Sequence, residues 1–362
     1  LELTMNRKRF QVLVSHVLGA SLLWLVSVSH GMAESPPDVK VTNVRRVYHN
    51  GEHNAFTDLV RWKGEYWLTF RSCPDGHMVH PTSSIRVLSS SDLKTWQEVH
   101  AFSVNKRDTR DPHFLVFQGK LFIYTGTWYS GETTLPRKDY DLNKHLGYGV
   151  WTAEGKKWSR PQPLEGTYGH YIWRAAEYDG KAYLCGRRNR DHAQVYGERD
   201  LVESAMLESD DGLVWRFHSL FQKDRGDETA FLFEEDGSIL AVSRSGSSPA
   251  QLVRSKPSYR KWTRVDFPDY IGGPLLKRWG DRYLVGGRRN TSNGAKTALY
   301  WLVDEQLHQF GELPSGGDNS YPGFVALDSR HGVVSWYSSH EKKDGKAITA
   351  IYMADLEIVE AD

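Results

Sequence analysis

The sequence of 362 residues has little cysteine, almost no net charge and few long apolar runs. Its two cysteines, Cys73 and Cys185, exclude a disulfide-rich scaffold, and we expect both thiols to be free or buried. The formal net charge of +1 gives no basic surface of the kind that binds nucleic acid. Beyond residue 33 no apolar run is long enough to span a bilayer, so we expect no membrane partner for that part.

The one long apolar run lies near the start of the sequence. Residues 12–28 follow the basic stretch 5–9 and precede Gly31-Met32-Ala33, whose small residues are typical of a signal-peptide cleavage site. A membrane anchor is the alternative, but the run is short for a span. We therefore expect a signal peptide over 1–33, a secreted or periplasmic product, and a single domain over 34–362.

The remaining sequence is a repeat of roughly fifty residues, present six times. Each copy has two apolar runs joined by a glycine turn, and an arginine often follows the second run. The turn glycines are Gly64, Gly119, Gly180, Gly237, Gly280 and Gly332. This period is typical of a β-propeller with one four-stranded blade per repeat. The fold class predicted is therefore all-β, a six-bladed propeller, in which a strand near Val41 completes the last blade.

The start of the first run and the end of the second run of each repeat are expected to reach the same rim of the propeller. Side chains at these positions should then surround one central opening. They include His53, Arg71, Asp111, His113, Tyr171, Arg174, Arg187, Glu228, Arg244, Arg288 and Tyr321. Several arginines directed at one point repel one another unless an anion lies between them. The alternative is that each arginine pairs with an acid of a neighbouring repeat.

A tryptophan after a small turn provides a second marker with the same period, as in Ser90–Trp96 and Ser209–Trp215. These turns resemble the Asp box, or BNR repeat, of the sialidase superfamily, and the resemblance covers roughly residues 50–340. The Asp box is a folding device in that superfamily. It occurs in sialidases, other propeller glycosidases, polysaccharide lyases and non-enzymatic propellers, so it specifies the fold more than the function.

Three further segments resemble the catalytic segments of exo-sialidases. Asp227-Glu228-Thr229 resembles the glutamate segment, Asn319-Ser320-Tyr321 the nucleophile segment, and Phe70–His77 the loop that carries the acid. The resemblance implies a retaining glycosidase in which Glu228 is the base for a Tyr321 nucleophile. Asp75 would be the acid, with His77 and His80 as rivals, and Arg187, Arg244 and Arg288 would hold the acidic group of a sialic or uronic acid-type sugar.

The first repeat departs from the sialidase pattern, because Glu52–Phe56 stands where those enzymes have an Arg-Ile-Pro type motif. Two alternatives therefore stay open. A polysaccharide lyase would use His113, Tyr171 and Arg187, with His53 as a further base, and a lectin-like propeller would bind an anionic glycan without turnover. Asp111 and His113 are interpreted as strand-capping residues, so we expect no metal and no other cofactor. A monomer is expected.

Overall fold

The computed structural model describes residues 36–194 and 199–359. The expected signal peptide over 1–33 lies outside the described residues. Strands dominate the described part, and its only helices are four 3-10 turns: η1 Arg137–Asp139, η2 Leu142–Lys144, η3 Arg190–His192 and η4 Arg199–Leu201. No helix in this part is long and apolar enough to cross a membrane.

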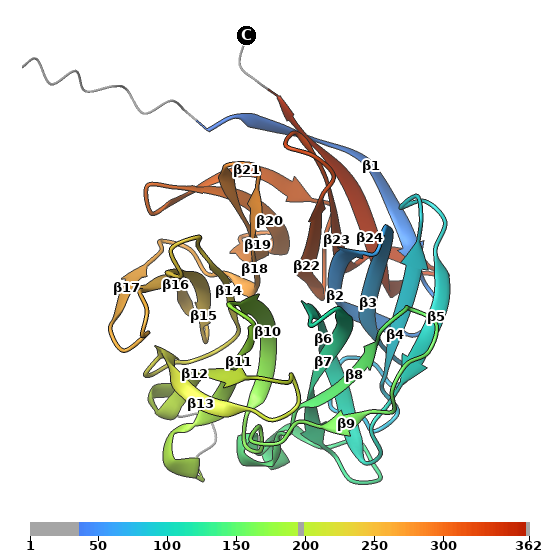
Figure 1. Ribbon diagram of the computed structural model, residues 1–362. Helices are drawn as coiled ribbons and strands as arrows, with labels where there is room; N and C mark the ends of the chain where they lie inside the picture. Colours follow the sequence, from blue (N-terminus) through green and yellow to red (C-terminus); the bar gives the residue numbers. More distant parts are fainter. Residues whose placement is uncertain (1–35, 195–198, 360–362) are drawn as a thin grey trace, which may run out of the picture. The chain divides into compact units, whose positions relative to one another are not determined.

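Six antiparallel four-stranded sheets surround a common centre (Figure 1). From the inner to the outer strand, blade 1 is β2 His53–Trp62, β3 Glu65–Cys73, β4 Ser84–Ser90 and β5 Gln97–Phe102; blade 2 is β6 Arg107–Phe117, β7 Lys120–Tyr129, β8 Tyr148–Thr152 and β9 Gln162–Pro163; blade 3 is β10 Tyr171–Tyr178, β11 Lys181–Asn189, β12 Val202–Ser209 and β13 Arg216–Gln222. The other three are blade 4, with β14 Thr229–Phe233, β15 Ile239–Ser245, β16 Ser248–Ser255 and β17 Trp262–Asp266; blade 5, with β18 Gly272–Trp279, β19 Arg282–Thr291, β20 Gly294–Val303 and β21 Gln306–Leu313; and blade 6, with β22 Asn319–Ala326, β23 His331–Lys343, β24 Lys346–Val359 and β1 Asp38–Tyr48. The predicted six-bladed propeller is confirmed.

Blade 6 closes the ring with strands from both ends of the domain. Strand β1 pairs antiparallel with β24, and Val41 lies opposite Leu356. Trp301 of blade 5 also donates its indole N–H to the carbonyl of Pro37 at 2.9 Å. Because the first strand completes the last sheet, β24 has no open edge with which another chain could pair. This closure was predicted from the strand near Val41.

In the Asp-box-like turns, an aspartate side chain accepts hydrogen bonds from the backbone of its own turn. Asp92 accepts hydrogen bonds from the backbone N–H groups of Lys94 and Thr95, both at 2.8 Å. Asp211 accepts in the same way from Leu213 and Val214, at 2.8 and 2.9 Å. These carboxylates accept hydrogen bonds from backbone N–H groups that have no carbonyl partner within the tight turn. The aspartates therefore have a structural role. Both cysteines, which belong to blades 1 and 3, are free and buried, as expected.

Candidate active site at the central opening

Five of the six innermost strands carry a β-bulge at the same depth. The interruptions in pairing follow Ala55, Arg110, Ile172, Gly272 and Ser320. The first bulged residues are Phe56, Asp111, Trp173, Gly273 and Tyr321. A bulge re-aims a side chain relative to the regular strand. Here it brings the bulged residues of different blades together around the axis.

Contacts between the bulged residues show where the centre lies. The ring of Tyr321 in blade 6 is 5.3 Å from that of Trp173 in blade 3, which is the opposite blade, and 4.9 Å from that of Phe56. Phe56, Asp111 and Tyr321 have φ angles of 64°, 51° and 53°, in the left-handed region that side chains other than glycine rarely adopt. Strain of this kind persists only where the surrounding structure holds it in place. It is found most often at functional sites.

Tyr321 and Glu228, which were expected at the same rim and are nucleophile and base by the resemblance, form a hydrogen bond. The phenol donates to Glu228 Oε1 at 2.8 Å. Glu228 Oε2 accepts from Arg244 Nη1 at 2.9 Å and from the backbone N–H of Gly273 at 3.0 Å. Both Tyr321 and Glu228 are buried. The carboxylate is therefore held by groups from blades 4, 5 and 6.

Gly273 is the position where a side chain would disturb this arrangement. A Cβ there would lie 2.7 Å from the ring of Tyr321, and the φ angle of Gly273 is 59°. A larger residue would be strained in this conformation and would displace the tyrosine. The glycine thus lets the backbone N–H reach Glu228 and lets the ring of Tyr321 approach blade 5 closely.

The environment of Tyr321 keeps its phenol neutral. Burial and the charge of Glu228 raise the pKa of Tyr321 well above its usual value, and Arg244 and Arg288 oppose this only in part. The guanidinium of Arg288 lies 5.5 Å from the centre of the Tyr321 ring. A neutral phenol that is hydrogen-bonded to an arginine-paired carboxyl group can pass its proton to that group when its oxygen attacks another atom.

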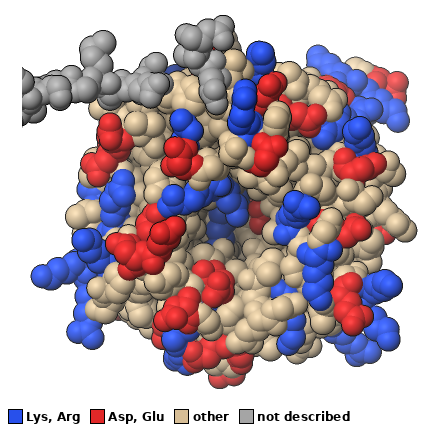
Figure 2. Space-filling view, turned by 45° about the horizontal axis from the view of Figure 1, so that its top comes forward, with Lys and Arg blue, Asp and Glu red and all other residues tan. Residues whose placement is uncertain are grey.

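Three arginines from neighbouring blades stand around the opening, and each pairs with an acid. Arg187 Nη1 is 2.7 Å from Asp227, Arg244 contacts both Asp227 and Glu228, and Arg288 Nη2 is 3.1 Å from Asp318. Pairing with an acid of a neighbouring repeat therefore holds for Arg187 and Arg288, whereas Arg244 pairs with acids of its own repeat. The pairing leaves the side chains 13%, 20% and 20% exposed, respectively. Figure 2 shows a hollow in the middle of one face, with Lys or Arg atoms inside it.

Asp111 lies in the same opening and is bonded to Tyr171, whose hydroxyl contacts Asp111 Oδ2. Burial raises the pKa of Asp111 to about 8; Arg110 opposes the rise, and Glu228 adds to it. Asp111 is therefore protonated at neutral pH. Its Oδ1 is buried without a hydrogen-bond partner in the protein. The site thus contains a neutral carboxyl group, Asp111, and a second carboxyl group, Glu228, that accepts hydrogen bonds from Tyr321 and Arg244.

Arg71 and Arg174 were expected among the side chains that surround the opening, as candidates for substrate binding, but the structure shows both of them buried in contacts within the protein. Arg71 is fully buried, and its guanidinium donates hydrogen bonds to both oxygens of Asp108 and to the carbonyls of Gly76 and Met78. Arg174 donates to Asp58 at 3.0 Å and to two proline carbonyls of blades 5 and 6. Both arginines therefore hold structural elements together and have no free donor directed at a ligand.

His113, Tyr171 and Arg187 were grouped in the lyase alternative. Tyr171 contacts Asp111, and Arg187 lies 5.1 Å over the Tyr171 ring. His113 is buried elsewhere, against Trp173 at 4.3 Å and 3.6 Å from Asp58. Burial lowers the pKa of His113 to about 4, so it is neutral. His113 thus lies next to the buried ion pair of Asp58 and Arg174, and not with Tyr171 and Arg187.

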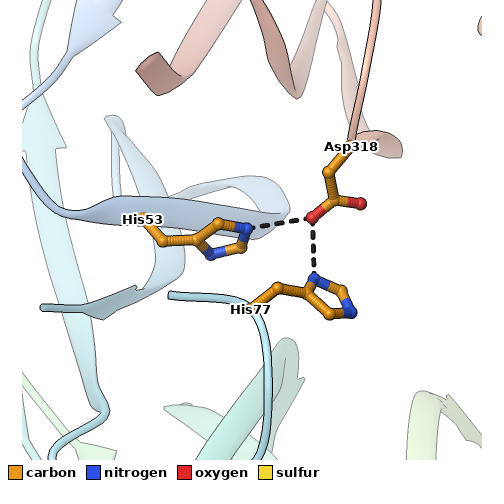
Figure 3. Close-up of side chains that lie close together, drawn as sticks. All are labelled: His53, His77 and Asp318. Carbon is orange, nitrogen blue, oxygen red and sulfur yellow. Dashed lines mark hydrogen bonds and ion pairs between the residues drawn. The ribbon is translucent and has the colours of Figure 1, made fainter. Parts of the chain in front are cut away.

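Asp75 and His77, two candidates for the catalytic acid, lie on the connection between β3 and β4. Their contacts differ from the sequence-based expectation. Asp75 is exposed and accepts from Thr82 of the same connection at 2.6 Å. His77 instead contacts Asp318 at 2.7 Å, and His53 contacts the same oxygen at 2.9 Å (Figure 3). Asp318 was not predicted from the sequence. The feature that could have identified it is its position directly before the Asn319-Ser320-Tyr321 segment.

A cavity of about 660 Å³ also lies at the outer part of blade 4, between the β14–β15 turn and the β16–β17 connection. Its lining includes Ile239, Lys256 and Lys261. None of the residues of the central opening lines this cavity. We place the candidate site at the opening because the strained backbone, the ion pairs and the raised pKa of Asp111 are found there.

Comparison with known proteins was made by family, by sequence and by structure. No family model and no curated protein matches the chain. Solved structures do match. A protein of unknown function from Dyadobacter fermentans is 21% identical with a TM-score of 0.71, and the match covers 89% of this chain and 100% of that protein.

Two sialic acid-related structures are also similar. A sialidase from Trypanosoma rangeli, in complex with 2,3-difluorosialic acid, has 14% identity and a TM-score of 0.60, over 86% of this chain and 55% of that one. The endosialidase of phage phi92 has 9% identity and a TM-score of 0.62, over 89% and 70%. The chain thus spans little more than half of the Trypanosoma enzyme. At these identities the likeness shows a sialidase-like propeller fold.

The structural role of Arg174 gives a first prediction. Replacing Arg174 by Met leaves the buried carboxylate of Asp58 without its ion-pair partner, which typically costs about 3–5 kcal/mol. The free energy of unfolding, measured by urea denaturation, should fall by that amount. Arg282→Met is the control, because Arg282 pairs with Asp281 at the exposed surface, where a pair contributes about 0–1 kcal/mol. An Arg174→Met protein of unchanged stability would return Arg174 to the candidate binding residues.

Proposed function

We propose that the protein is a retaining glycoside hydrolase that acts on a glycan carrying an anionic sugar of the sialic or uronic acid type. The observation that carries the proposal is the hydrogen bond from the buried, neutral Tyr321 to Glu228. A neutral nucleophile suits a substrate whose own carboxylate lies near the reacting carbon, because an anionic nucleophile would be repelled. The sialidase-like fold supports the same class of reaction.

The two half-reactions follow from this pair. In the first, the oxygen of Tyr321 attacks the anomeric carbon, its proton passes to Glu228 Oε1, and the bond to the leaving oxygen breaks. In the second, water attacks the anomeric carbon and gives a proton to the carboxyl group that protonated the leaving oxygen, the bond to Tyr321 breaks, and the proton on Glu228 returns to the phenolate oxygen. Arg244 and the N–H of Gly273 hold Glu228 Oε2 and leave Oε1 to exchange the proton.

The leaving oxygen must receive a proton, and we assign this role to Asp111 in place of Asp75. Asp111 is protonated at neutral pH because burial raises its pKa to about 8. A carboxyl group that burial keeps protonated at neutral pH is suited to act as the general acid. Asp75, by contrast, is exposed and accepts a hydrogen bond from Thr82 of its own connection.

Arg187, Arg244 and Arg288 are assigned to the acidic group of the substrate. Each is tied to an acid that orients it, and each keeps part of its guanidinium accessible from the opening. A guanidinium has five N–H donors, so one acidic partner does not exhaust it. Asp227 and Asp318 would then position the arginines that contact the substrate.

The Tyr321→Phe variant tests the nucleophile. It retains the ring and its packing but loses the attacking oxygen, so kcat should fall at least ~10³-fold while the Kd for substrate changes little. Turnover would be measured on a panel of sialylated and uronate-containing glycans, together with the ultraviolet absorbance of the products. Tyr129→Phe is the control, because Tyr129 is exposed. Undiminished activity of Tyr321→Phe would remove Tyr321 as nucleophile, and an absorbing, unsaturated product would indicate a lyase.

The pH dependence tests Asp111. The active form of an acid is the protonated one, so kcat/KM should fall tenfold per pH unit above about pH 8, the pKa of Asp111. Asp111→Asn should lower kcat/KM about 10²–10⁴-fold for natural glycans and abolish this alkaline limb. The loss should be smaller for an aryl glycoside, whose phenolate needs less protonation. An Asn variant that keeps the alkaline limb would show that the limb belongs to another group.

A further inference from the structure

His53, His77 and Asp318 form a cluster at the rim of the opening, and the proposed hydrolysis assigns no role to its two histidines. Asp318 Oδ2 lies 2.9 Å from His53 Nε2 and 2.7 Å from His77 Nδ1 (Figure 3). The three donor atoms lie within 4.8 Å of one another. They come from the start of β2, the β3–β4 connection and the connection that precedes β22. The fold therefore brings three separate segments to one point.

We propose that this cluster is a binding site for a divalent transition-metal ion, and that Zn²⁺ fits it best. Two imidazole nitrogens and one carboxylate oxygen are the donor types that Zn²⁺ takes, and three protein ligands with one open position are typical of zinc sites that bind a further ligand. Mg²⁺ and Ca²⁺ prefer all-oxygen ligands, so the two histidines disfavour them. This proposal differs from the sequence-based expectation of no metal.

The spacing of the donor atoms needs only a small adjustment for the ion. Zn–N and Zn–O bonds of about 2.0–2.2 Å in a tetrahedron place the ligand atoms about 3.3–3.6 Å apart. The His53 and His77 nitrogens lie closer than this to Asp318, because each ring now shares a hydrogen bond with it. An outward shift of about half an ångström is needed. His77 is 44% exposed and lies on a connection between strands, so it has room for this shift.

The surroundings of Asp318 support the assignment. Its second oxygen, Oδ1, accepts hydrogen bonds from the Tyr337 hydroxyl at 2.9 Å and from Arg288 at 3.1 Å. Outer partners of this kind fix the orientation of a metal-binding carboxylate. Oδ2 is left to face the two histidines. The carboxylate is thus divided between one oxygen that anchors it to the protein and one that is directed at the cluster.

The cluster also leaves one side open. The side chains of His53, Asp318 and His77 are 10%, 26% and 44% exposed, respectively, so exposure increases towards His77. His77 also packs 5.8 Å from the ring of Phe56, one of the bulged residues of the opening. A bound ion would therefore keep a coordination position for water or for an oxygen atom of a ligand in the opening. Metal binding itself does not depend on the reaction proposed for Tyr321.

Isothermal titration calorimetry with ZnCl₂ tests the site directly. The full protein, stripped with EDTA and dialysed, should bind one Zn²⁺ per chain. His53→Ala and His77→Ala should each weaken this binding at least ~100-fold, because even outer partners of a metal site contribute 10–100-fold. Tyr337→Phe, which removes one anchor of Asp318, should weaken it about 10–100-fold. Substitution with Co²⁺ should give visible absorption bands of a four-coordinate ion, and these should be lost in the histidine variants.

His331→Ala is the matched control, because His331 forms an exposed pair with Asp328 at 3.0 Å outside the cluster. Its Zn²⁺ affinity should equal that of the parent protein. Circular dichroism in EDTA would show that each variant is folded. Absence of stoichiometric Zn²⁺ binding by the folded parent, or equal binding by the folded His53→Ala and His77→Ala variants, would overturn the proposal. Neither outcome bears on Tyr321, whose variant is tested by turnover.

Discussion

The carboxylate of Glu228 is the group on which the arrangement of the opening depends. It accepts hydrogen bonds from Tyr321, Arg244 and the backbone of Gly273, so three of the six blades meet at its two oxygens. A buried carboxylate is costly unless such partners replace its lost hydration. The fixed orientation of Glu228 and the neutral state of Tyr321 both depend on this one set of contacts.

The bulges on the inner strands make these contacts possible. Regular pleating would alternate the side chains between the two faces of each blade. The bulge turns Tyr321 towards blades 3 and 5 and holds it at a φ angle of 53°, and Gly273 supplies the space for its ring. The energy of the strained backbone is offset by packing against Trp173 and Phe56. The position of Tyr321 at the centre therefore depends on residues of several blades, and no single blade could fix it.

The sequence predicts the ring and its central pair well, because both depend on the repeat. The regularly spaced glycine turns indicate six blades, and equivalent places in two repeats bring Glu228 and Tyr321 to one rim. The repeat does not predict side-chain direction. Arg174 is the second residue of its bulge and turns to Asp58, since a shift of one residue reverses the face of a strand. Asp318 lies in an irregular connection, so only tertiary packing places it beside His53 and His77.

The central claim is that Tyr321 forms a covalent bond to the sugar, and trapping that intermediate tests it most directly. A fluorinated anionic sugar with a good leaving group slows the second half-reaction more than the first, so the glycosyl-enzyme should accumulate. Mass spectrometry of the digested protein should then find the mass of the fluorosugar on the peptide that contains Tyr321. Adduct formation on another residue, or release of the leaving group with no adduct at any time, would contradict the account.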